Sequence, residues 1–469
     1  MTFAHRFDAT VLREYDIRGR LGRTLHETDA FAVGRCFGSV VAREGGRSVA
    51  VGYDGRTSSP MLEAALVAGL KASGAAVVRI GRGPTPMLYF ASATLPADGA
   101  VMITGSHNPA DYNGFKMVLR NKPFFGSRIA ELGRMAETGD VVPEAAGTER
   151  GADVSDAYLA RLLADWDGGE RALKVVWDNG NGAAGAVLPR LLERLPGSHT
   201  VLFPEIDGRF PNHHPDPTLP QNLQHLIAEV RRTGADLGIA FDGDADRIGV
   251  VDAEGEIFFG DQLLVVLARD VLRTHPGATI IADVKASGVL FDEIARAGGV
   301  PLMFKTGHSL IKAKMAEIGS PLAGEMSGHV FFADHWYGFD DALYAAVRLL
   351  GIVARMAEPL AAVRKALPSV VNTPELRFDC DDGRKFAVIA EVAARLRTAG
   401  ASVSEIDGVR VSTDDGWWLL RASNTQAVLV ARAEAADAEG LDRLKAALAG
   451  QLTASGLAVP DFSQASAGH

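Results

Sequence analysis

The chain has 469 residues, of which 47% are hydrophobic and 23% are charged, and its formal net charge is −10. Such a length predicts about three domains, with two to four all compatible, and the composition is typical of a soluble globular protein. Because binding to a phosphate backbone requires a basic face, the acidic balance argues against a nucleic-acid partner. A few converging Arg and Lys side chains can still bind a small anionic substrate.

The two cysteines, Cys36 and Cys380, lie far apart, so we predict neither a disulfide framework nor a zinc site. The first residues carry charges and lack the apolar core of a signal peptide. No uncharged run approaches the ~18 residues that a membrane-spanning helix needs. We therefore expect a cytoplasmic protein with no membrane partner.

Apolar runs that are typical of buried strands alternate with helical patterns over most of the chain. Such runs occur at 49–52, 75–80 and 99–103, and the pattern restarts at 174–177 and again at 278–284. This alternation predicts βαβ units and largely parallel, buried sheets. We expect three similar α/β modules of roughly a hundred residues each.

The pattern changes after residue 368. Two helical stretches, 386–398 and 439–452, flank three strand-like runs, which predicts a smaller α+β domain. The predicted fold class is thus α/β, with three modules built on mixed or parallel sheets and a C-terminal α+β domain. The predicted domains are residues 1–150, 151–254, 255–367 and 368–469.

The segment 241–247 (FDGDADR) is the most informative part of the chain. It follows the apolar run 237–240 and places Asp242, Asp244 and Asp246 on alternate positions. A loop at the end of a strand can curl three carboxylates around one point, and their repulsion then requires a cation, Mg²⁺ first and Mn²⁺ second. The alternative for such a motif alone is a solvated acidic turn, but the strand before it and the arginine after it favour a metal site.

Three further polar loops follow apolar strands, where α/β modules bind ligands beside the N-termini of the next helices. Residues 104–109 (TGSHNP) place an exposed serine next to a histidine, which suits nucleophilic or phosphate chemistry. Residues 324–329 (GEMSGH) offer groups for the hydroxyls of a polyol, and residues 421–425 (RASNT) offer donors for an anion. Each loop alone is also compatible with a plain turn. Lys285 and His308 follow strands of the third module and are weaker candidates for substrate contact.

Together, the four loops, in this order and at these separations, resemble the α-D-phosphohexomutase family over essentially the whole chain. The wording GEMSGH is most similar to the bacterial phosphomannomutase/phosphoglucomutase branch. The resemblance implies four domains, three of them alike, around a central active-site cleft. It implies that Ser106 carries the phosphoryl group and that an oxygen of the phosphoserine completes the Mg²⁺ site.

The resemblance also implies the roles of the remaining site residues. The catalytic set is Ser106, His107, Lys116, Arg247, His308 and His329. The metal ligands are Ser106, Asp242, Asp244 and Asp246. The substrate-binding set is Tyr15, Arg18, Lys285, Glu325, Ser327, His329, Arg421, Ser423, Asn424 and Thr425.

The implied activity is the reversible conversion of hexose 6-phosphate, of mannose or glucose, to hexose 1-phosphate. Phosphorylated Ser106 donates its phosphoryl group to O1 or O6, and the resulting 1,6-bisphosphate reorients and returns its other phosphate. Glucose 1,6-bisphosphate is therefore expected as activator and intermediate, beside Mg²⁺. Lys116, His308 and His329 are all candidates for the base. The expected partners are hexose phosphates, and the expected state is a monomer or weak dimer.

Three alternatives remain at this point. The sugar loop of phosphoglucosamine mutases differs little, so an amino sugar is an alternative substrate. A metal-dependent sugar-phosphate phosphohydrolase would use an acid of the 242–246 loop as nucleophile and leave Ser106 incidental. A non-catalytic sugar-phosphate sensor would have no need of the serine.

Overall fold

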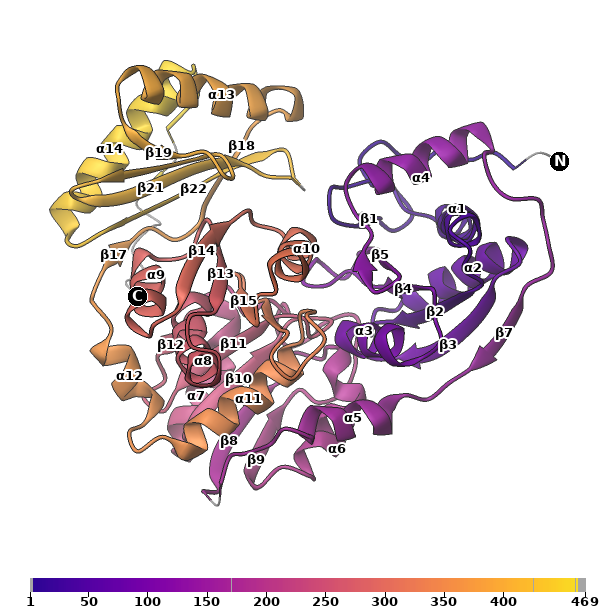
Figure 1. The fold of residues 1–469 in the computed structure, drawn as a ribbon, viewed down its shortest axis with the longest axis horizontal. Coiled ribbons are helices and arrows are strands. Elements are labelled where there is room, and N and C mark those ends of the chain that lie inside the picture. The colour runs from indigo at the N-terminus through magenta and orange to yellow at the C-terminus, as the bar shows by residue number, and fades with distance from the viewer. Residues whose placement is uncertain (1–2, 170, 425, 460, 463–469) are drawn as a thin grey trace.

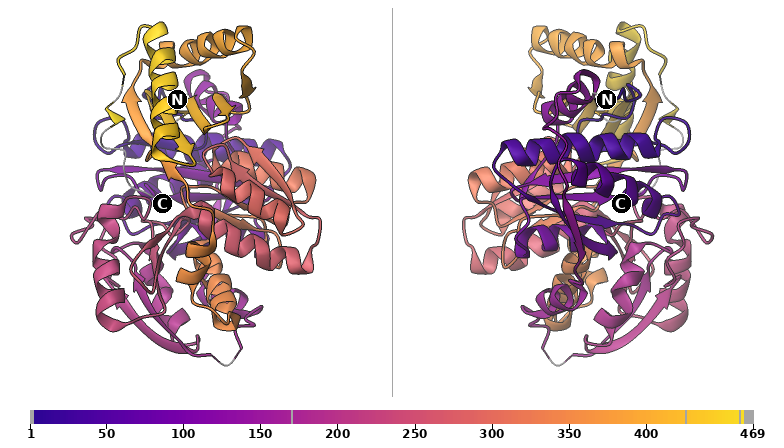
Figure 2. Two further views of the ribbon diagram at one scale, coloured as in Figure 1. Left: turned by 90° about the vertical axis from the view of Figure 1, so that its left-hand side faces the viewer. Right: turned by 90° about the vertical axis from the view of Figure 1, so that its right-hand side faces the viewer.

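The computed structural model describes residues 3–169, 171–424, 426–459 and 461–462. The described residues form four β-sheets that follow one another along the chain, each covered by helices (Figure 1). In both views of Figure 2 the C-terminal domain and the second module lie at opposite ends of the molecule. None of the described helices is long and apolar enough to cross a lipid bilayer.

The first sheet has the order β1-β5-β4-β2-β3-β7, and β6 pairs with β5. β4 pairs in parallel with β2 and antiparallel with β5, and its side chains are buried on both faces. α1, α2 and α4 share a core on one face, and α3 packs on the other. The elements are β1 (Ile17–Arg20), α1 (Glu27–Arg43), β2 (Ser48–Tyr53), α2 (Ser59–Ala72), β3 (Ala76–Arg82), α3 (Thr85–Thr94), β4 (Gly99–Ile103), β5 (Tyr112–Leu119), β6 (Lys122–Pro123), α4 (Ser127–Thr138) and β7 (Thr148–Gly151).

The second sheet has the order β12-β11-β10-β8-β9, in which β9, β8 and β10 are parallel and β11 and β12 are antiparallel. Its central strand β10 is fully buried. The elements are α5 (Ser155–Leu163), β8 (Leu173–Asp178), the 3₁₀ helix η1 (Ala183–Ala186), α6 (Leu188–Leu192), β9 (Gly197–Leu202), the 3₁₀ helix η2 (Pro220–Leu223), α7 (Gln224–Thr233), β10 (Leu237–Phe241), β11 (Ile248–Asp252) and β12 (Ile257–Phe258).

The third sheet has the order β14-β13-β15-β16, with three parallel strands and β16 antiparallel at the edge. Its elements are α8 (Gly260–Thr274), β13 (Thr279–Asp283), α9 (Gly288–Arg296), β14 (Val300–Phe304), α10 (His308–Ile318), β15 (Leu322–Gly324), β16 (Val330–Phe332), α11 (Ala342–Arg355) and α12 (Leu360–Ala366).

The fourth sheet, β17-β22-β21-β20-β19 with β18 beside β22, is antiparallel throughout its described pairs. α13 and α14 pack on this sheet and share its core. The elements are β17 (Val371–Asn372), β18 (Leu376–Asp379), α13 (Asp382–Thr398), β19 (Ser402–Ser404), β20 (Val409–Thr413), β21 (Gly416–Ala422), β22 (Val428–Ala435) and α14 (Ala438–Ala454).

The apolar core does not divide evenly among the four sheets. One continuous cluster includes Tyr89 and Phe90 of α3, Trp177 of the second sheet and Tyr344 of α11. The C-terminal domain has its own core, and it meets the third module through a small cluster around Trp417. The first three modules are therefore packed together, whereas the fourth is joined more lightly.

The predicted fold class, three α/β modules followed by an α+β domain, is confirmed. Each of the four polar loops follows a strand, as predicted, and joins that strand to an antiparallel partner. The pairs are β4–β5, β10–β11, β15–β16 and β21–β22. The predicted residue boundaries of the domains stay a prediction.

Candidate active site

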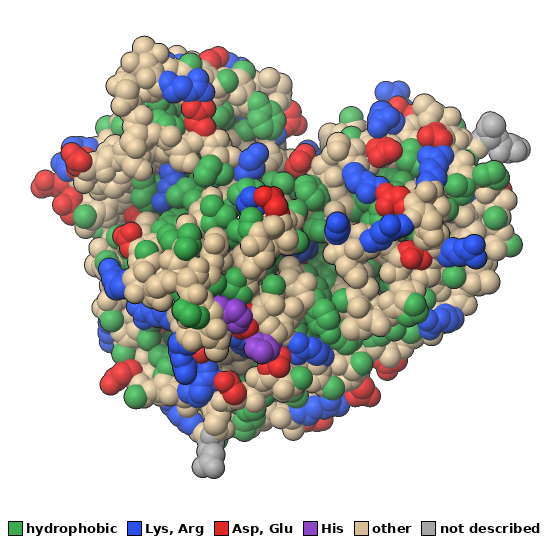
Figure 3. Space-filling model, in the orientation of Figure 1, with side chains coloured by type: hydrophobic (Ala, Val, Ile, Leu, Met, Phe, Trp, Pro, Cys, Tyr) green, Lys and Arg blue, Asp and Glu red, His purple; other side chains and the backbone are tan. Residues whose placement is uncertain are grey.

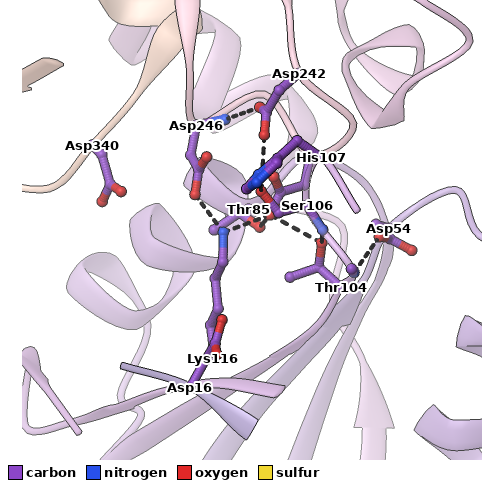
Figure 4. A network of polar contacts seen from close by, with 12 residues as sticks. Asp16, Asp54, Thr85, Thr104, Ser106, His107, Lys116, Asp242, Asp246 and Asp340 are labelled. Carbon is purple, nitrogen blue, oxygen red and sulfur yellow. Dashed lines mark hydrogen bonds and ion pairs between the residues drawn. The ribbon is translucent and has the colours of Figure 1, made fainter. Parts of the chain in front are cut away.

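Ser106 lies in the connection between β4 and β5. Its Oγ lies 2.9 Å from Oδ2 of Asp242 and 3.1 Å from Nδ1 of His107 (Figure 4). The side chain is buried, so the expectation of an exposed serine is wrong: the second module covers it. Ser106 has a φ of 47°, in the left-handed region that few non-glycine residues adopt. Contacts with its surroundings must therefore hold this backbone in place.

The buried guanidinium of Arg56 supplies such contacts. Nη2 donates to the carbonyl oxygens of Ser106, at 2.7 Å, and of Asn108, at 2.6 Å. Nη1 donates to two further carbonyls, one in the same loop and one on the first residue of β5. Asp54 pairs with Arg56 at 3.3 Å. Sequence reasoning did not assign these two residues to the site, although they directly follow the strand predicted at 49–52. Their position after a strand was the available signal.

The three aspartates of the β10–β11 connection are fully buried, and one carboxylate oxygen of each lies within 4.8 Å of the others. Ala245 has a φ of 58°, which turns the loop so that the carboxylates converge. Within the described part of the chain, Oδ1 of Asp244 and Oδ1 of Asp246 have no hydrogen-bond partner. Because buried charged oxygens without partners are unfavourable, this cradle fits a hard divalent cation.

Lys116 of β5 balances part of this negative charge. Its Nζ donates to Oδ2 of Asp244 at 2.8 Å and also to Asp246. Burial opposes the charge of Lys116, but the two aspartates raise its pKa well above the usual range, so the amine keeps its proton. Burial and repulsion by the other two aspartates raise the pKa of Asp242 well above its usual range. A divalent cation would relieve that repulsion.

His329 and His308 lie beside the aspartate loop, and their rings stack with centroids 5.5 Å apart. Nε of Arg247 donates to Nε2 of His329 at 3.0 Å. Because a guanidinium can only donate, Nε2 accepts, and the ring proton lies on Nδ1, which is 3.1 Å from Asp340. Lys312 donates to the other oxygen of Asp340 at 2.8 Å. No sequence motif marks Asp340 or Lys312, and sequence reasoning missed both.

The surroundings of His107 and His308 lower the pKa of each ring. Burial, followed by the positive charge of Arg247, lowers the pKa of His107 well below its usual range. Burial and the charge of Lys312 lower the pKa of His308 in the same way. Both rings are therefore neutral near pH 7 in this arrangement.

The β15–β16 connection carries Glu325 and the half-buried Ser327. Oε1 of Glu325 accepts a hydrogen bond from the backbone N–H of Gly307 at 2.7 Å. Asp283, at the end of β13, accepts from the N–H of Met326 at 3.2 Å and so holds the same loop. The predicted Lys285 lies further along, where its Nζ donates to Glu375 of the C-terminal domain at 2.8 Å.

Arg421 lies near the end of β21, and the connection between β21 and β22 carries Ser423 and Asn424; the predicted Thr425 lies outside the described residues. Nδ2 of Asn424 donates to the hydroxyl of Tyr15 at 2.6 Å. The hydroxyl of Tyr15 in turn donates to the carbonyl of Thr306 at 2.8 Å. Tyr15 therefore connects the first module to the third and fourth.

The structure brings the predicted residues into two groups. One surrounds Ser106 and includes His107, Lys116, Arg247, His329 and the three aspartates. The other surrounds Tyr15 and includes Glu325, Arg421 and Asn424. The ring of Tyr15 lies 6.1 Å from that of His308, which joins the two groups. Arg18 is near the first group and pairs with Asp16. Figure 3 shows the surface hollowed between the C-terminal domain and the first module.

A separate cavity of about 930 Å³ lies between the first and third modules. Tyr89, Val118 and Phe339 are among the residues that line it. Neither Ser106 nor the aspartates contribute to it, and its lining is mostly apolar. This cavity is therefore distinct from the cluster of polar groups around Ser106.

Comparison with protein families gives matches along nearly the whole chain. The matching models are described as phosphoglucomutase/phosphomannomutase. Their α/β/α domains I, II and III match residues 9–140, 156–255 and 259–371, and their C-terminal domain matches residues 375–451.

Individual proteins agree with these matches. A phosphomannomutase/phosphoglucomutase of Pseudomonas putida is 46% identical over 93% of this chain and 94% of its own. A phosphoglucomutase of Neisseria gonorrhoeae is 44% identical over 93% of this chain and 95% of its own. The crystal structure of a phosphoglucomutase/phosphomannomutase family protein from Burkholderia thailandensis has a TM-score of 0.91 at 45% identity, and the match covers 97% of this chain and 99% of that one.

Proposed function

Because the chain belongs to the phosphoglucomutase/phosphomannomutase family of α-D-phosphohexomutases, we propose that it interconverts hexose 6-phosphates and hexose 1-phosphates with Ser106 as the phosphoryl carrier. The family predicted from the sequence is confirmed, and with it the assignment to the isomerases that interconvert hexose phosphates. The observation that carries the proposal is the position of Ser106 Oγ, 2.9 Å from Asp242 in the aspartate loop of another module.

The buried carboxylates of Asp242, Asp244 and Asp246, with an oxygen of phosphorylated Ser106, would hold Mg²⁺. Bound there, the ion would neutralise charge on the transferring phosphoryl group. Arg56 holds the carbonyl of Ser106, so the side chain is presented to the cleft in one orientation.

Of the three candidate bases, hydrogen bonding favours His329. Lys116 is a protonated donor to two aspartates. Nε2 of His329 is an acceptor, and its Nδ1 lies 3.1 Å from Oδ2 of Asp340. When Arg247 turns to a substrate phosphate, Nε2 of His329 becomes available to accept the proton of the attacking sugar hydroxyl.

The residues around Tyr15 would bind the part of the substrate that carries the non-reacting phosphate. Arg421, Ser423 and Asn424 offer donors for its phosphate, and Glu325 and Ser327 offer oxygens for sugar hydroxyls. A 1,6-bisphosphate that turns around would present its other phosphate to the same donors, so one clamp serves both directions. Tyr15, Arg18 and Lys285 would complete the wall of the cleft.

The sugar loop and the names of the relatives support mannose and glucose phosphates as substrates. A structure of an Aspergillus fumigatus N-acetylphosphoglucosamine mutase was solved in complex with glucose 1,6-bisphosphate, but at 13% identity it shares only the fold with this chain. Mg²⁺, glucose 1,6-bisphosphate as activator, the cytoplasmic location and the monomeric or weakly dimeric state stay predictions.

A coupled assay with Mg²⁺ and a trace of glucose 1,6-bisphosphate tests the proposal. It compares mannose 1-phosphate, glucose 1-phosphate and glucosamine 1-phosphate, with Ser106→Ala beside the wild type. We expect bisphosphate-dependent turnover of the first two sugars and its loss in the variant. Turnover chiefly of the amino sugar would instead identify a phosphoglucosamine mutase. Release of free phosphate without isomerisation, unaffected by Ser106→Ala, would rule out the mutase assignment.

A further inference from the structure

Asp407 lies next to the phosphate-binding group, in the connection between β19 and β20, and sequence reasoning did not single it out. Its Oδ2 accepts from Nε of Arg421 at 2.9 Å, and its Oδ1 accepts from Nη2 of the same arginine at 3.3 Å. Oδ2 also accepts from the backbone N–H of Thr306, in the third module, at 3.0 Å. One carboxylate therefore joins the guanidinium of the C-terminal domain to a loop of another module.

The loop that Asp407 reaches is a junction of three modules. The carbonyl of Thr306 accepts from the hydroxyl of Tyr15, which itself accepts from Asn424. The next residue, Gly307, donates its N–H to Glu325 of the sugar loop at 2.7 Å. A Cβ at Gly307 would lie 2.5 Å from Cζ of Tyr15, so only glycine allows this approach.

The negative charge of Asp407 lies beside an arginine that is proposed to bind a phosphate. A carboxylate beside an arginine that binds phosphate repels the incoming anion, so on electrostatic grounds alone its removal should tighten binding. Both side chains are largely buried, however, at 7% exposure for Arg421 and 12% for Asp407. Burial opposes the charge of Arg421, and Asp407 raises its pKa. The pair also fixes the plane of the guanidinium, since two of its nitrogens meet one carboxylate.

We propose that Asp407 is a positioning residue for the phosphate clamp. It holds Arg421 through Nε and Nη2, which leaves Nη1, to which the described residues offer no hydrogen bond, available to a phosphate oxygen. Through Thr306 it keeps the clamp in register with Glu325, so that phosphate and sugar are held at a constant separation. This inference rests on the proposed function and assigns the non-reacting phosphate of a hexose phosphate to the Nη1 side of Arg421.

Two variants separate the two contacts. Asp407→Asn keeps the shape and an oxygen that can accept from Thr306, but it loses the charge that pairs with Arg421. Asp407→Ala loses both contacts. Asp415→Asn is the matched control, because Asp415 pairs with Arg443 on the exposed surface of the same domain. Thermal unfolding of each variant shows whether it is folded under the assay conditions.

We expect Asp407→Asn to raise the KM for glucose 1-phosphate about tenfold, as befits one charge-assisted hydrogen bond, while kcat changes by less than about threefold. In Asp407→Ala we also expect the ratio of kcat/KM for mannose 1-phosphate and glucose 1-phosphate to change, because the link to Glu325 is lost. Asp415→Asn should leave all of these values unchanged. An unchanged or lower KM in folded Asp407→Asn would overturn the proposal, since it would mean that the carboxylate only opposes the anion.

Calorimetric binding of glucose 6-phosphate to the wild type and Asp407→Asn provides a test that does not need turnover. Weaker binding in the variant supports positioning, and equal or tighter binding refutes it. If the wild type shows no mutase activity, the proposed function fails, while this comparison still decides the role of Asp407. If either Asp407 variant does not fold, Tyr15→Phe is used instead, because it removes the hydrogen bonds of the Tyr15 hydroxyl with Thr306 and Asn424 at the same junction. The proposal then requires a raised KM in Tyr15→Phe and is refuted by an unchanged one.

Discussion

At the scale of single residues, Ser106, the proposed phosphoryl carrier, depends on a partner that no sequence motif indicates. Ser106 has a left-handed backbone, and Arg56 is the buried group that donates to the carbonyls around it. The segment 104–109 around Ser106 is recognisable in the sequence through its resemblance to the family's phosphoserine loop, whereas alone it is also compatible with a plain turn. Arg56 lies fifty positions earlier, and only the folded chain shows that its guanidinium reaches the loop.

The role of Arg56 predicts the effect of a conservative change. Arg56→Lys keeps the charge near Asp54, but an ammonium cannot reproduce the fork that meets several carbonyls. We expect kcat to fall about a hundredfold, as for a small displacement of a reacting group. Unfolding by urea should show a loss of about 2 kcal/mol. Arg209→Lys, on an exposed arginine, is the control, and equal turnover in the two variants would contradict the role given to Arg56.

At the scale of elements, the four polar loops share one design: a strand, a short polar turn and an antiparallel return strand. The first strand of each of the first three pairs is also part of a parallel ladder, so its end points to the cleft. The Ser106 turn and the aspartate turn are in direct contact, because Gly243 approaches the carbonyl of Ser106 closely. A Cβ at Gly243 would lie 2.4 Å from that oxygen.

This contact between two turns predicts that Gly243→Ala separates them. The added methyl group meets backbone, which cannot rotate away as a flexible side chain can. We expect single-turnover phosphorylation of the protein by glucose 1,6-bisphosphate to slow about a hundredfold. The control is Gly450→Ala in α14, where a Cβ would meet nothing within 4 Å; there we expect a gain of about 0.5–1 kcal/mol in unfolding free energy. Normal phosphorylation in Gly243→Ala would show that the close approach is dispensable.

At the scale of the whole molecule, the first three modules form a packed scaffold and the fourth domain is docked onto it. Arg410 carries much of this docking. Its Nη1 donates to the carbonyls of Val284, at 2.6 Å, and Ala286, at 2.9 Å, and its guanidinium lies 3.6 Å from the centroid of the Trp417 ring. Burial lowers the pKa of Arg410 to about 10, which still leaves it charged near pH 7.

Weakening the contact between the fourth domain and the third module should impair phosphate binding by Arg421, Ser423 and Asn424, although none of these three residues is changed. Arg410→Leu removes the two interdomain hydrogen bonds, and we expect the KM for glucose 1-phosphate to rise about tenfold. Small-angle scattering should show a larger radius of gyration. Arg397→Leu removes an exposed ion pair of the same domain and should change neither quantity. A compact Arg410→Leu variant with a normal KM would show that contacts other than those of Arg410 hold the fourth domain in place.

Much of the site was predictable because its chemistry lies in short segments. The aspartate loop is an example: three aspartates on alternate positions, with an apolar strand before them and Arg247 after them, favour convergence around a cation over a solvated acidic turn. The alternation of strands and helices likewise predicts α/β modules, since hydrophobic periodicity reports which faces are buried.

The tertiary structure decided which groups meet across the modules. The burial of Ser106, the tautomer of His329 and the pairing of Asp407 with Arg421 each depend on residues from separate loops or modules. Their relative positions follow from how whole sheets and domains pack. Local sequence determines the chemistry that each loop carries. The distances between the loops are determined by interdomain packing, which no short segment of sequence specifies.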